Sequence, residues 1–250
     1  MTRTFASIVI TGASSGIGEA LALDYAAPGI ALALSGRNAD RLNAVADSCR
    51  AKGAMVDAAT IDVVDRAALA AWLTRFDHSH PVDLLVANAG VSIDNDKSSL
   101  DEFSRLRETM AINVDGVFNT VEPLVGRMME RGHGQIAVVS SLASFIGLPY
   151  AASYNASKAA VRVWGESIRY VLKKYGVGVS VICPGFVRGR LTDDAPFPTP
   201  FLMTPAQAAA IIRRGLTRNQ ARIAFPIGIK AAVWFGTTLP GRWSARLLGA

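Results

Sequence analysis

Short runs of almost continuous hydrophobic residues alternate along the chain with longer stretches in which hydrophobic residues recur every three or four positions. The short runs have the length and residue types of buried β-strands, and the longer stretches have the periodicity of α-helices. Strands that are apolar on both faces and alternate with helices predict an α/β fold, in which helices flank a doubly wound parallel sheet. The predicted strands span residues 5–11, 30–35, 53–60, 82–87, 134–140 and 178–183.

The predicted helices span residues 15–26, 39–49, 64–76, 100–131 and 150–175. The fourth is too long for one uninterrupted helix, and we expect it to bend near Gly116 or Pro123. Gly176 closes the fifth. We find no internal repeat and no linker, so residues 1–250 are expected to form a single domain.

Two segments do not follow this alternation. Residues 184–205 are rich in proline and charge, and form either a lid over a substrate or a disordered excursion. Apolar side chains that a lid could bury favour the lid; they are Phe197, Phe201, Leu202 and Met203. Residues 226–250 mix Trp and Phe with Lys and Arg, as interfacial membrane helices do. A helix packed on the core or on a second subunit has the same composition, and we favour that interpretation.

The amino-acid composition limits which classes of protein are possible. Half of the 250 residues are hydrophobic and 18% are charged, which supplies a large core and argues against disorder. The net charge of +6 favours anionic partners, such as a phosphorylated cofactor, an acidic substrate or a membrane surface. The basic residues are scattered and no nucleic-acid motif is present, so nucleic acid is not an expected partner.

The cysteines and the first residues indicate the compartment. Cys49 and Cys183 are far apart and read as small buried hydrophobes in a reducing compartment. The apolar start leads directly into a glycine loop, which predicts a first strand rather than a signal peptide. No uninterrupted apolar segment is long enough for a transmembrane helix, so a cytoplasmic protein is expected.

The glycine loop "TGASSGIGEA" (11–20) follows the first predicted strand and opens the first helix. Gly12 permits a sharp exit from the strand, Gly16 a close approach to a phosphate, and Gly18 close packing of the helix on the sheet. Amides at the helix N-terminus then face an anion. The loop therefore predicts a dinucleotide site, with a purely structural turn as the alternative.

The end of the second predicted strand bears on the choice of dinucleotide. An acidic side chain there would bind the ribose 2′-hydroxyl of NAD, but Gly36 occupies the position and Arg37 follows. A guanidinium can clamp a 2′-phosphate and stack on adenine, so NADP is favoured over NAD. Alternatively, Arg37 only borders a solvated loop. Asp40 is interpreted as a charge at the start of the next helix.

Two further strand ends add candidates for the nucleotide site. Asp62, with the amide of Val63, either holds the adenine edge or caps the helix that follows. Asn88, Ala89 and Gly90 suit a turn that passes close to a ribose.

A third set of residues carries proton chemistry. Ser141 ends the fifth predicted strand, and parallel sheets place ligands outside the carboxyl ends of their strands. Tyr154 and Lys158 lie four residues apart, on one face of the next helix. A nearby ammonium and an oxidised nicotinamide would favour the phenolate, while Ser141 could bind the substrate oxygen. This arrangement predicts carbonyl or alcohol chemistry with a hydride donor. Taken singly, each residue could instead be structural.

With these motifs the chain resembles the short-chain dehydrogenase/reductase family. "TGASSGIG", "DVVD", "ANAG", Asn113, "SSLAS", "YNASK" and "PG" (184–185) occur in the family's order over about residues 5–225. The resemblance implies a Rossmann fold, with Tyr154 as general acid/base, Lys158 on the nicotinamide ribose and Ser141 polarising the substrate oxygen. It also implies that Asn113 orders a water linked to Lys158, and that helices 100–131 and 150–175 form a homodimer or homotetramer.

The expected site is therefore defined. The expected catalytic residues are Asn113, Ser141, Tyr154 and Lys158. The expected cofactor-binding residues are Gly12, Ser14, Ser15, Gly16, Ile17, Gly18, Arg37, Asp62, Val63, Asn88, Ala89, Gly90, Tyr154, Lys158, Pro184, Gly185 and Val187. No metal site is expected.

The chain departs from the family pattern at two positions. Ala87 stands where a second Asn is common, and Gly189 stands where a Thr commonly holds the nicotinamide carboxamide. Val187 backbone or Arg188 would have to compensate for the missing threonine.

The expected function is NADP(H)-dependent hydride transfer to or from a carbonyl or secondary alcohol of a small, largely apolar substrate. An apolar wall is expected from Leu142, Phe145, Ile146 and Leu148. Arg188 and Arg190 either bind an anionic substrate group or lie in solvent. The alternatives are a non-catalytic NADP(H)-binding scaffold or redox sensor, and an epimerase or dehydratase, for which no extra acid/base pair is found.

Overall fold

The computed structural model describes residues 2–93, 101–148, 150–193 and 199–238. It has seven strands: β1 (Ser7–Thr11), β2 (Ala31–Gly36), β3 (Met55–Thr60), β4 (Leu84–Ala87), β5 (Gln135–Val139), β6 (Gly178–Pro184) and β7 (Arg222–Phe225). Its α-helices are α1 (Gly16–Tyr25), α2 (Ala39–Ala51), α3 (Arg66–Ser79), α4 (Glu102–Met110), α5 (Gly116–Arg131), α6 (Ala152–Lys173), α7 (Pro205–Thr217) and α8 (Ile227–Thr238). A π-helical turn, η1 (Ala111–Asp115), and a 3₁₀ turn, η2 (Leu142–Phe145), complete the elements.

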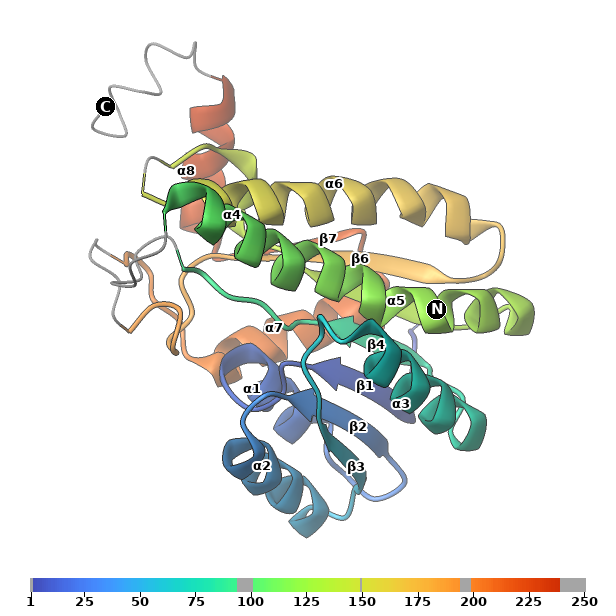
Figure 1. The fold of residues 1–250 in the computed structure, drawn as a ribbon. Helices are drawn as coiled ribbons and strands as arrows, with labels where there is room; N and C mark the ends of the chain where they lie inside the picture. Colours follow the sequence, from blue (N-terminus) through green and yellow to red (C-terminus); the bar gives the residue numbers. More distant parts are fainter. Residues whose placement is uncertain (1, 94–100, 149, 194–198, 239–250) are drawn as a thin grey trace.

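All seven strands are parallel and form one sheet in the order β3-β2-β1-β4-β5-β6-β7. Helices α1, α2 and α7 cover one face, and α3, α4, α5 and α6 cover the other (Figure 1). The predicted single-domain, doubly wound fold is therefore confirmed.

The continuous hydrophobic runs are explained by two cores, one on each face of the sheet. Along β1, Ile8 and Ile10 point into the core under α1, α2 and α7, while Val9 points into the other. Successive side chains of a strand alternate between faces, so a strand covered on both sides needs an apolar residue at every position.

β7 and α7, which lie after residue 204, were not predicted from the sequence. β7 is only four residues long and lies at the edge of the sheet, where it pairs with β6 alone. α7 begins with a capping box, in which the side chains of Thr204 and Gln207 each bind the other's backbone amide. That pair and Pro205 were a usable start signal.

The long helical stretch remains helical throughout, and only its hydrogen-bonding pattern changes next to Gly116, one of the two positions where a bend was expected. α4 ends at Met110, η1 follows, and α5 begins at Gly116, whereas Pro123 lies inside α5. A Cβ on Gly116 would lie 2.5 Å from Cγ2 of Val63, so this glycine also allows α5 to approach the segment that follows β3.

α8 lies in the segment 226–250, for which the sequence allowed either a membrane-surface helix or a helix packed on protein. Ile229 and Val233 pack against Leu142, Val181 and Cys183, whereas Ile227, Trp234 and Phe235 are exposed. Of the residues expected to fill the lid, Phe197 lies outside the described residues. None of the described helices is long and apolar enough to cross a bilayer.

Candidate active site

A cavity of about 560 Å³ lies at the carboxyl ends of the central strands. Its walls come from the glycine loop (residues 12–18), the ends of β2, β4 and β5, the first turn of α6, and residues 184–192. Among the residues expected from the sequence, Gly18 and Asn113 lie behind this wall, and all the others line it. The two halves of the expected site therefore face one space.

The conformation of the glycine loop depends on Gly12 and Gly16. Gly12 and Gly16 have φ angles of 66° and 62°, a region that favours glycine. A Cβ on Gly12 would lie 2.8 Å from the Ala89 Cα, whereas one on Gly16 would meet nothing within 4 Å. Gly16 therefore leaves its backbone open to the cavity. Ser15 caps α1 without a side-chain hydrogen bond, so the side chain leaves the first amides of the helix for a ligand.

Gly18 allows α1 to lie close to the ends of two sheet strands. Its Cβ would lie 2.4 Å from the carbonyl oxygen of Gly12, which follows β1, and 2.6 Å from Nδ2 of Asn88, which follows β4. Asn88 Nδ2 donates to the carbonyl oxygens of Thr11, at 2.9 Å, and Gly12, at 3.1 Å. Asn88 thus ties the end of β4 to the glycine loop.

The end of β2 supplies a basic wall. Arg37 lines the cavity and forms a long ion pair with Asp62, at 3.7 Å between partly exposed side chains. A Cβ on Gly36 would lie 3.0 Å from Ser14 Oγ, so an acidic residue there would displace Ser14. Arg41, four residues after Arg37, also lines the cavity. Arg41 was not predicted from the sequence, although it lies four residues after Arg37 at the start of a predicted helix.

The capping alternative for Asp62 is wrong. Asp65 caps α3 by accepting a hydrogen bond from the Ala68 amide at 3.0 Å. Asp62 Oδ1 instead accepts from the Val64 amide at 3.2 Å, in a turn that places the carboxylate on the cavity wall. The interpretation of Asp40 as a charge in the first turn of α2 is confirmed.

Lys158 is buried, and its ammonium donates to the Val139 carbonyl oxygen at 3.0 Å. Burial lowers the pKa of Lys158 from 10.5 to about 8. Ser140 Oγ donates to the Lys158 carbonyl oxygen at 2.7 Å, which ties α6 to the end of β5. The cation is therefore rigidly placed at the floor of the cavity.

Tyr154 lies one turn before Lys158, whose Nζ is 5.8 Å from the ring centroid. Burial raises the pKa of Tyr154 above its usual value, and a hydrogen bond with Ser141 opposes this rise. In this state the phenol is protonated at neutral pH. It can therefore donate a proton to an oxygen bound beside Ser141.

Asn113 lies in η1 and is fully buried. Its amide group accepts from the Val91 amide at 2.8 Å and donates to the Val91 carbonyl oxygen and to Ser157 Oγ, both at 2.9 Å. A Cβ on Gly90 would lie 3.0 Å from Asn113 Oδ1 and 3.1 Å from Lys158 Nζ, so both atoms border Gly90. Asn113 therefore fixes the segment after β4 next to Lys158.

The prediction of which residues form the apolar wall of the cavity is wrong. Leu142 and Phe145 pack beneath α8 with Val181 and Cys183, and neither lines the cavity. Ile146 and Leu148 do not line it either. The apolar lining comes instead from Ile17, Val91, Ile93, Ile112 and Leu191. The 3₁₀ turn after Ser141 directs the following side chains away from the pocket.

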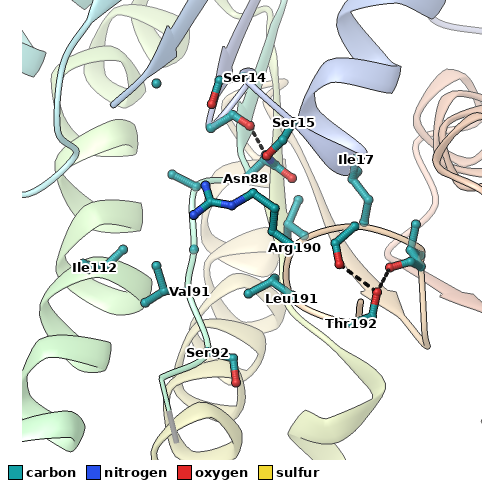
Figure 2. Close-up of a pocket in the computed structure, with 18 of the residues that line it drawn as sticks. Ser14, Ser15, Ile17, Asn88, Val91, Ser92, Ile112, Arg190, Leu191 and Thr192 are labelled. Atoms are coloured by element: carbon teal, nitrogen blue, oxygen red, sulfur yellow. Dashed lines mark hydrogen bonds between the residues drawn. The ribbon is translucent and has the colours of Figure 1, made fainter. Parts of the chain in front are cut away.

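Residues 186–193 form an ordered loop over the glycine loop. Val187 pairs with Met203 in an isolated bridge, and the Arg188 amide donates to the Met203 carbonyl oxygen at 2.9 Å. Figure 2 shows Arg190 extending from this loop across the pocket, toward the wall formed by Asn88 and Val91. Arg188 is exposed at the rim. Of the described residues, no three His, Cys, Asp or Glu form a group that could bind a metal.

Comparison with known proteins settles the family. A model of the short chain dehydrogenases matches residues 6–196. The chain belongs to the short-chain dehydrogenase family. An uncharacterized oxidoreductase of Myxococcus xanthus is 36% identical over 238 residues, which cover 95% of this chain and 94% of that protein.

Solved structures agree on the fold. A short chain dehydrogenase of Mycobacterium paratuberculosis bound to NAD has a TM-score of 0.78 at 25% identity, covering 90% of this chain and 97% of that one. A short-chain dehydrogenase of Sphingobium yanoikuyae in complex with NADPH has a TM-score of 0.81 at 24% identity, covering 96% and 94%. The chain is thus an oxidoreductase of a family that binds nicotinamide dinucleotides, and the fold alone does not choose between NAD and NADP.

The departure from the family pattern at Gly189 has a local structural reason. Gly189 has a φ of 148°, which strains any other residue, and its Cβ would lie 3.8 Å from the Gly16 Cα. Thr192, three residues later, donates its hydroxyl to the carbonyl oxygens of Val187, at 2.7 Å, and Gly189, at 3.0 Å (Figure 2). In this short-chain dehydrogenase the threonine therefore closes the loop on itself.

Proposed function

We propose that the protein is an NADP(H)-dependent oxidoreductase that transfers hydride between the nicotinamide and a carbonyl or secondary alcohol of a small, largely apolar substrate. The observation that supports this most is the convergence of Ser141, Tyr154 and Lys158 on the cavity that the glycine loop also lines. The dinucleotide supplies the hydride donor or acceptor. The cavity fits such a group, because Gly16 leaves backbone open beside the uncapped start of α1.

The chain's own residues would divide the work. The glycine loop and the α1 amides bind the diphosphate, Asp62 and Val63 border the adenine, and Asn88, Ala89 and Gly90 border a ribose. Lys158 holds the nicotinamide ribose, Pro184, Gly185 and Val187 border the nicotinamide, and Asn113 fixes the wall next to Lys158. During reduction, Ser141 binds the substrate oxygen and Tyr154 donates the proton to it. The side chains Val91, Ile93, Ile112 and Leu191 favour an apolar substrate.

The preference for NADP rests on Arg37 and Arg41, which line the wall where β2 ends, and on Gly36, where Ser14 leaves little space for an acid. Arg37→Asp is expected to raise the Michaelis constant for NADPH about tenfold or more, because it removes a charge-assisted contact with the 2′-phosphate. NADH, which lacks that phosphate, is the internal control. Arg50→Asp, in the last turn of α2, makes the same change of charge away from the cavity and is the control. An unchanged constant for NADPH would refute the assignment.

The reaction is tested by following NADPH consumption across a panel of aliphatic, cyclic and aryl ketones and aldehydes. Tyr154→Phe should lower kcat about 100-fold or more while NADPH still binds, because it removes only the proton donor. Tyr175→Phe, two residues beyond the C-terminal end of α6, should leave kcat unchanged. Equal turnover by Tyr154→Phe would overturn the mechanism. Tight NADPH binding without turnover of any compound would favour the non-catalytic scaffold.

We also propose a homo-oligomer formed through α5 and α6. An open groove of about 860 Å³ lies between these helices, with Phe118, Val125, Trp164, Ile168 and Val171 on its walls. The rings of Phe118 and Trp164 contact each other at 4.9 Å between centroids. Val163 and Val171 on α6 are more than half exposed, as expected of a face that a second copy covers.

A further inference from the structure

The position of Ser141 depends on the turn that follows it. Ser141 is the N-cap of η2, and its Oγ accepts from the Ala143 amide at 3.1 Å. Ser144 Oγ donates to the Ser141 carbonyl oxygen at 2.6 Å. These bonds make η2 one short unit from Ser141 to Phe145. Whatever holds the far end of this unit therefore orients Ser141.

Two guanidinium groups hold that far end. The Cζ of Arg162 lies 4.2 Å from the centroid of the Phe145 ring, and the Cζ of Arg222 lies 5.0 Å from it. Arg162 Nη2 also donates to the Ser144 carbonyl oxygen at 3.4 Å. Arginine stacks on aromatic rings through its planar, weakly hydrated cation. Phe145 is thus fixed to α6 by Arg162 and to β7 by Arg222.

Glu166 joins the two arginines. Its Oε2 pairs with Arg162 Nη1 at 3.2 Å, and its Oε1 accepts from Arg222 Nε at 2.9 Å and Nη2 at 2.5 Å. Arg162 and Glu166 are one turn apart on α6, and both side chains are more than seven-tenths buried. Arg162 Nε is buried without a hydrogen-bond partner among the described residues. A shared carboxylate keeps both cations over one ring despite their mutual repulsion.

We propose that Arg162, Glu166 and Arg222 form a clamp on Phe145 that fixes Ser141 relative to Tyr154. α6 carries Tyr154 in its first turn, and Arg162 lies about two turns later, eight residues along the same helix. One rigid helix therefore supplies the proton donor and holds the turn that carries its partner. The clamp residues act as positioning residues, because none of them lines the cavity. The inference rests on the proposed roles of Ser141 and Tyr154.

A double-mutant cycle with the full chain tests the clamp. The assay uses NADPH and whichever ketone or aldehyde of the panel gives the highest turnover. Phe145→Leu and Arg162→Met are each expected to lower kcat about fivefold or more, with the Michaelis constant for NADPH changed less than about twofold. In a Ser141→Ala background, the same substitutions should change kcat less than about twofold, because Ser141 carries their effect. Phe145→Tyr retains the ring and should restore near wild-type kcat.

A second measurement needs no turnover. Hydrogen–deuterium exchange of a peptide covering residues 140–146 should accelerate in Phe145→Leu, while the glycine-loop peptide stays unchanged. Arg213→Met is the matched control, because it removes a guanidinium 5.2 Å from the Tyr25 ring centroid, away from the site. Unchanged exchange, or a full kcat effect in the Ser141→Ala background, would overturn the clamp. If Ser141→Ala and Tyr154→Phe leave turnover unchanged, the proposed function itself fails.

Discussion

Replacing Lys158 by methionine should stabilise the protein while abolishing its turnover. Lys158 is 3% exposed and has no acidic partner among the described residues, so its charge is buried with one carbonyl contact. Its pKa falls from 10.5 to about 8 on folding. Because one pKa unit corresponds to about 1.4 kcal/mol, burying the charge opposes folding by about 3 kcal/mol at pH 7. Methionine has a similar length and no charge.

The hydrogen bond to Val139 partly offsets this gain. Its loss should destabilise the variant by about 1 kcal/mol, which leaves Lys158→Met about 2 kcal/mol more stable than the wild type at pH 7. The lysine pKa is lower in the folded state, so the unfolded chain binds more protons between pH 8 and 10.5. Wild-type stability therefore rises through this window, and the difference between the two proteins should vanish near about pH 10.

The measurement is urea unfolding without cofactor at pH 7 and near pH 10, followed by tryptophan fluorescence. Lys173→Met, exposed on the same helix, is the matched control and should change the free energy of unfolding by less than about 0.5 kcal/mol at both pH values. A variant less stable than the wild type at pH 7 would refute the reasoning. So would a difference that does not change with pH. Turnover should fall because Lys158 is proposed to hold the nicotinamide ribose.

Four further substitutions test other parts of the molecule. Gly18→Ala should lower the free energy of unfolding by about 2 kcal/mol, because its Cβ would meet the Gly12 carbonyl oxygen at 2.4 Å. Gly126→Ala, exposed in α5 with open space around it, should instead raise it by about 0.5–1 kcal/mol, as urea titration will show. Val171→Glu in the groove should shift sedimentation from oligomer to monomer, and an unchanged sedimentation coefficient would contradict the proposed interface. Burial alone would raise the pKa of Asp77, but Arg131, the Val82 amide and Arg127 lower it on balance. Asp77→Asn should therefore cost about 3 kcal/mol or more at pH 7, and less as pH falls through the pKa of the native carboxylate.

The fold was predictable because a central strand that is buried on both faces has an apolar residue at nearly every position. Ile8, Val9 and Ile10 alternate between two cores, so their run is continuous. β7 lacked this signal, because a four-residue edge strand that starts with exposed Arg222 offers little pattern. The glycine loop was visible because its residues are contiguous. Local sequence thus predicted most of the elements, whereas β7 and α7 were missed as whole elements.

The less predictable parts of the site depend on contacts across the fold. Asn113 binds the backbone of Val91, 22 residues away, and nothing near it in sequence indicates this. Phe145 was expected in the pocket because it lies close to Tyr154 in sequence. A single 3₁₀ turn directs it beneath α8 instead. Such outcomes are set by tertiary packing, which no periodicity encodes.

The strand order also sets a sequence of events during synthesis. β1 lies between β2 and β4, so the residues proposed to bind the adenine and the diphosphate have all been synthesised once about the first 93 residues have left the ribosome. At that moment β4 has one unpaired edge, because its partner β5 begins at Gln135. Val117, Val121 and Val161, which belong to the core on the α3–α6 face of the sheet, have not yet been synthesised either. An open strand edge beside uncovered apolar surface favours aggregation, so the nascent chain is most vulnerable between β4 and β5.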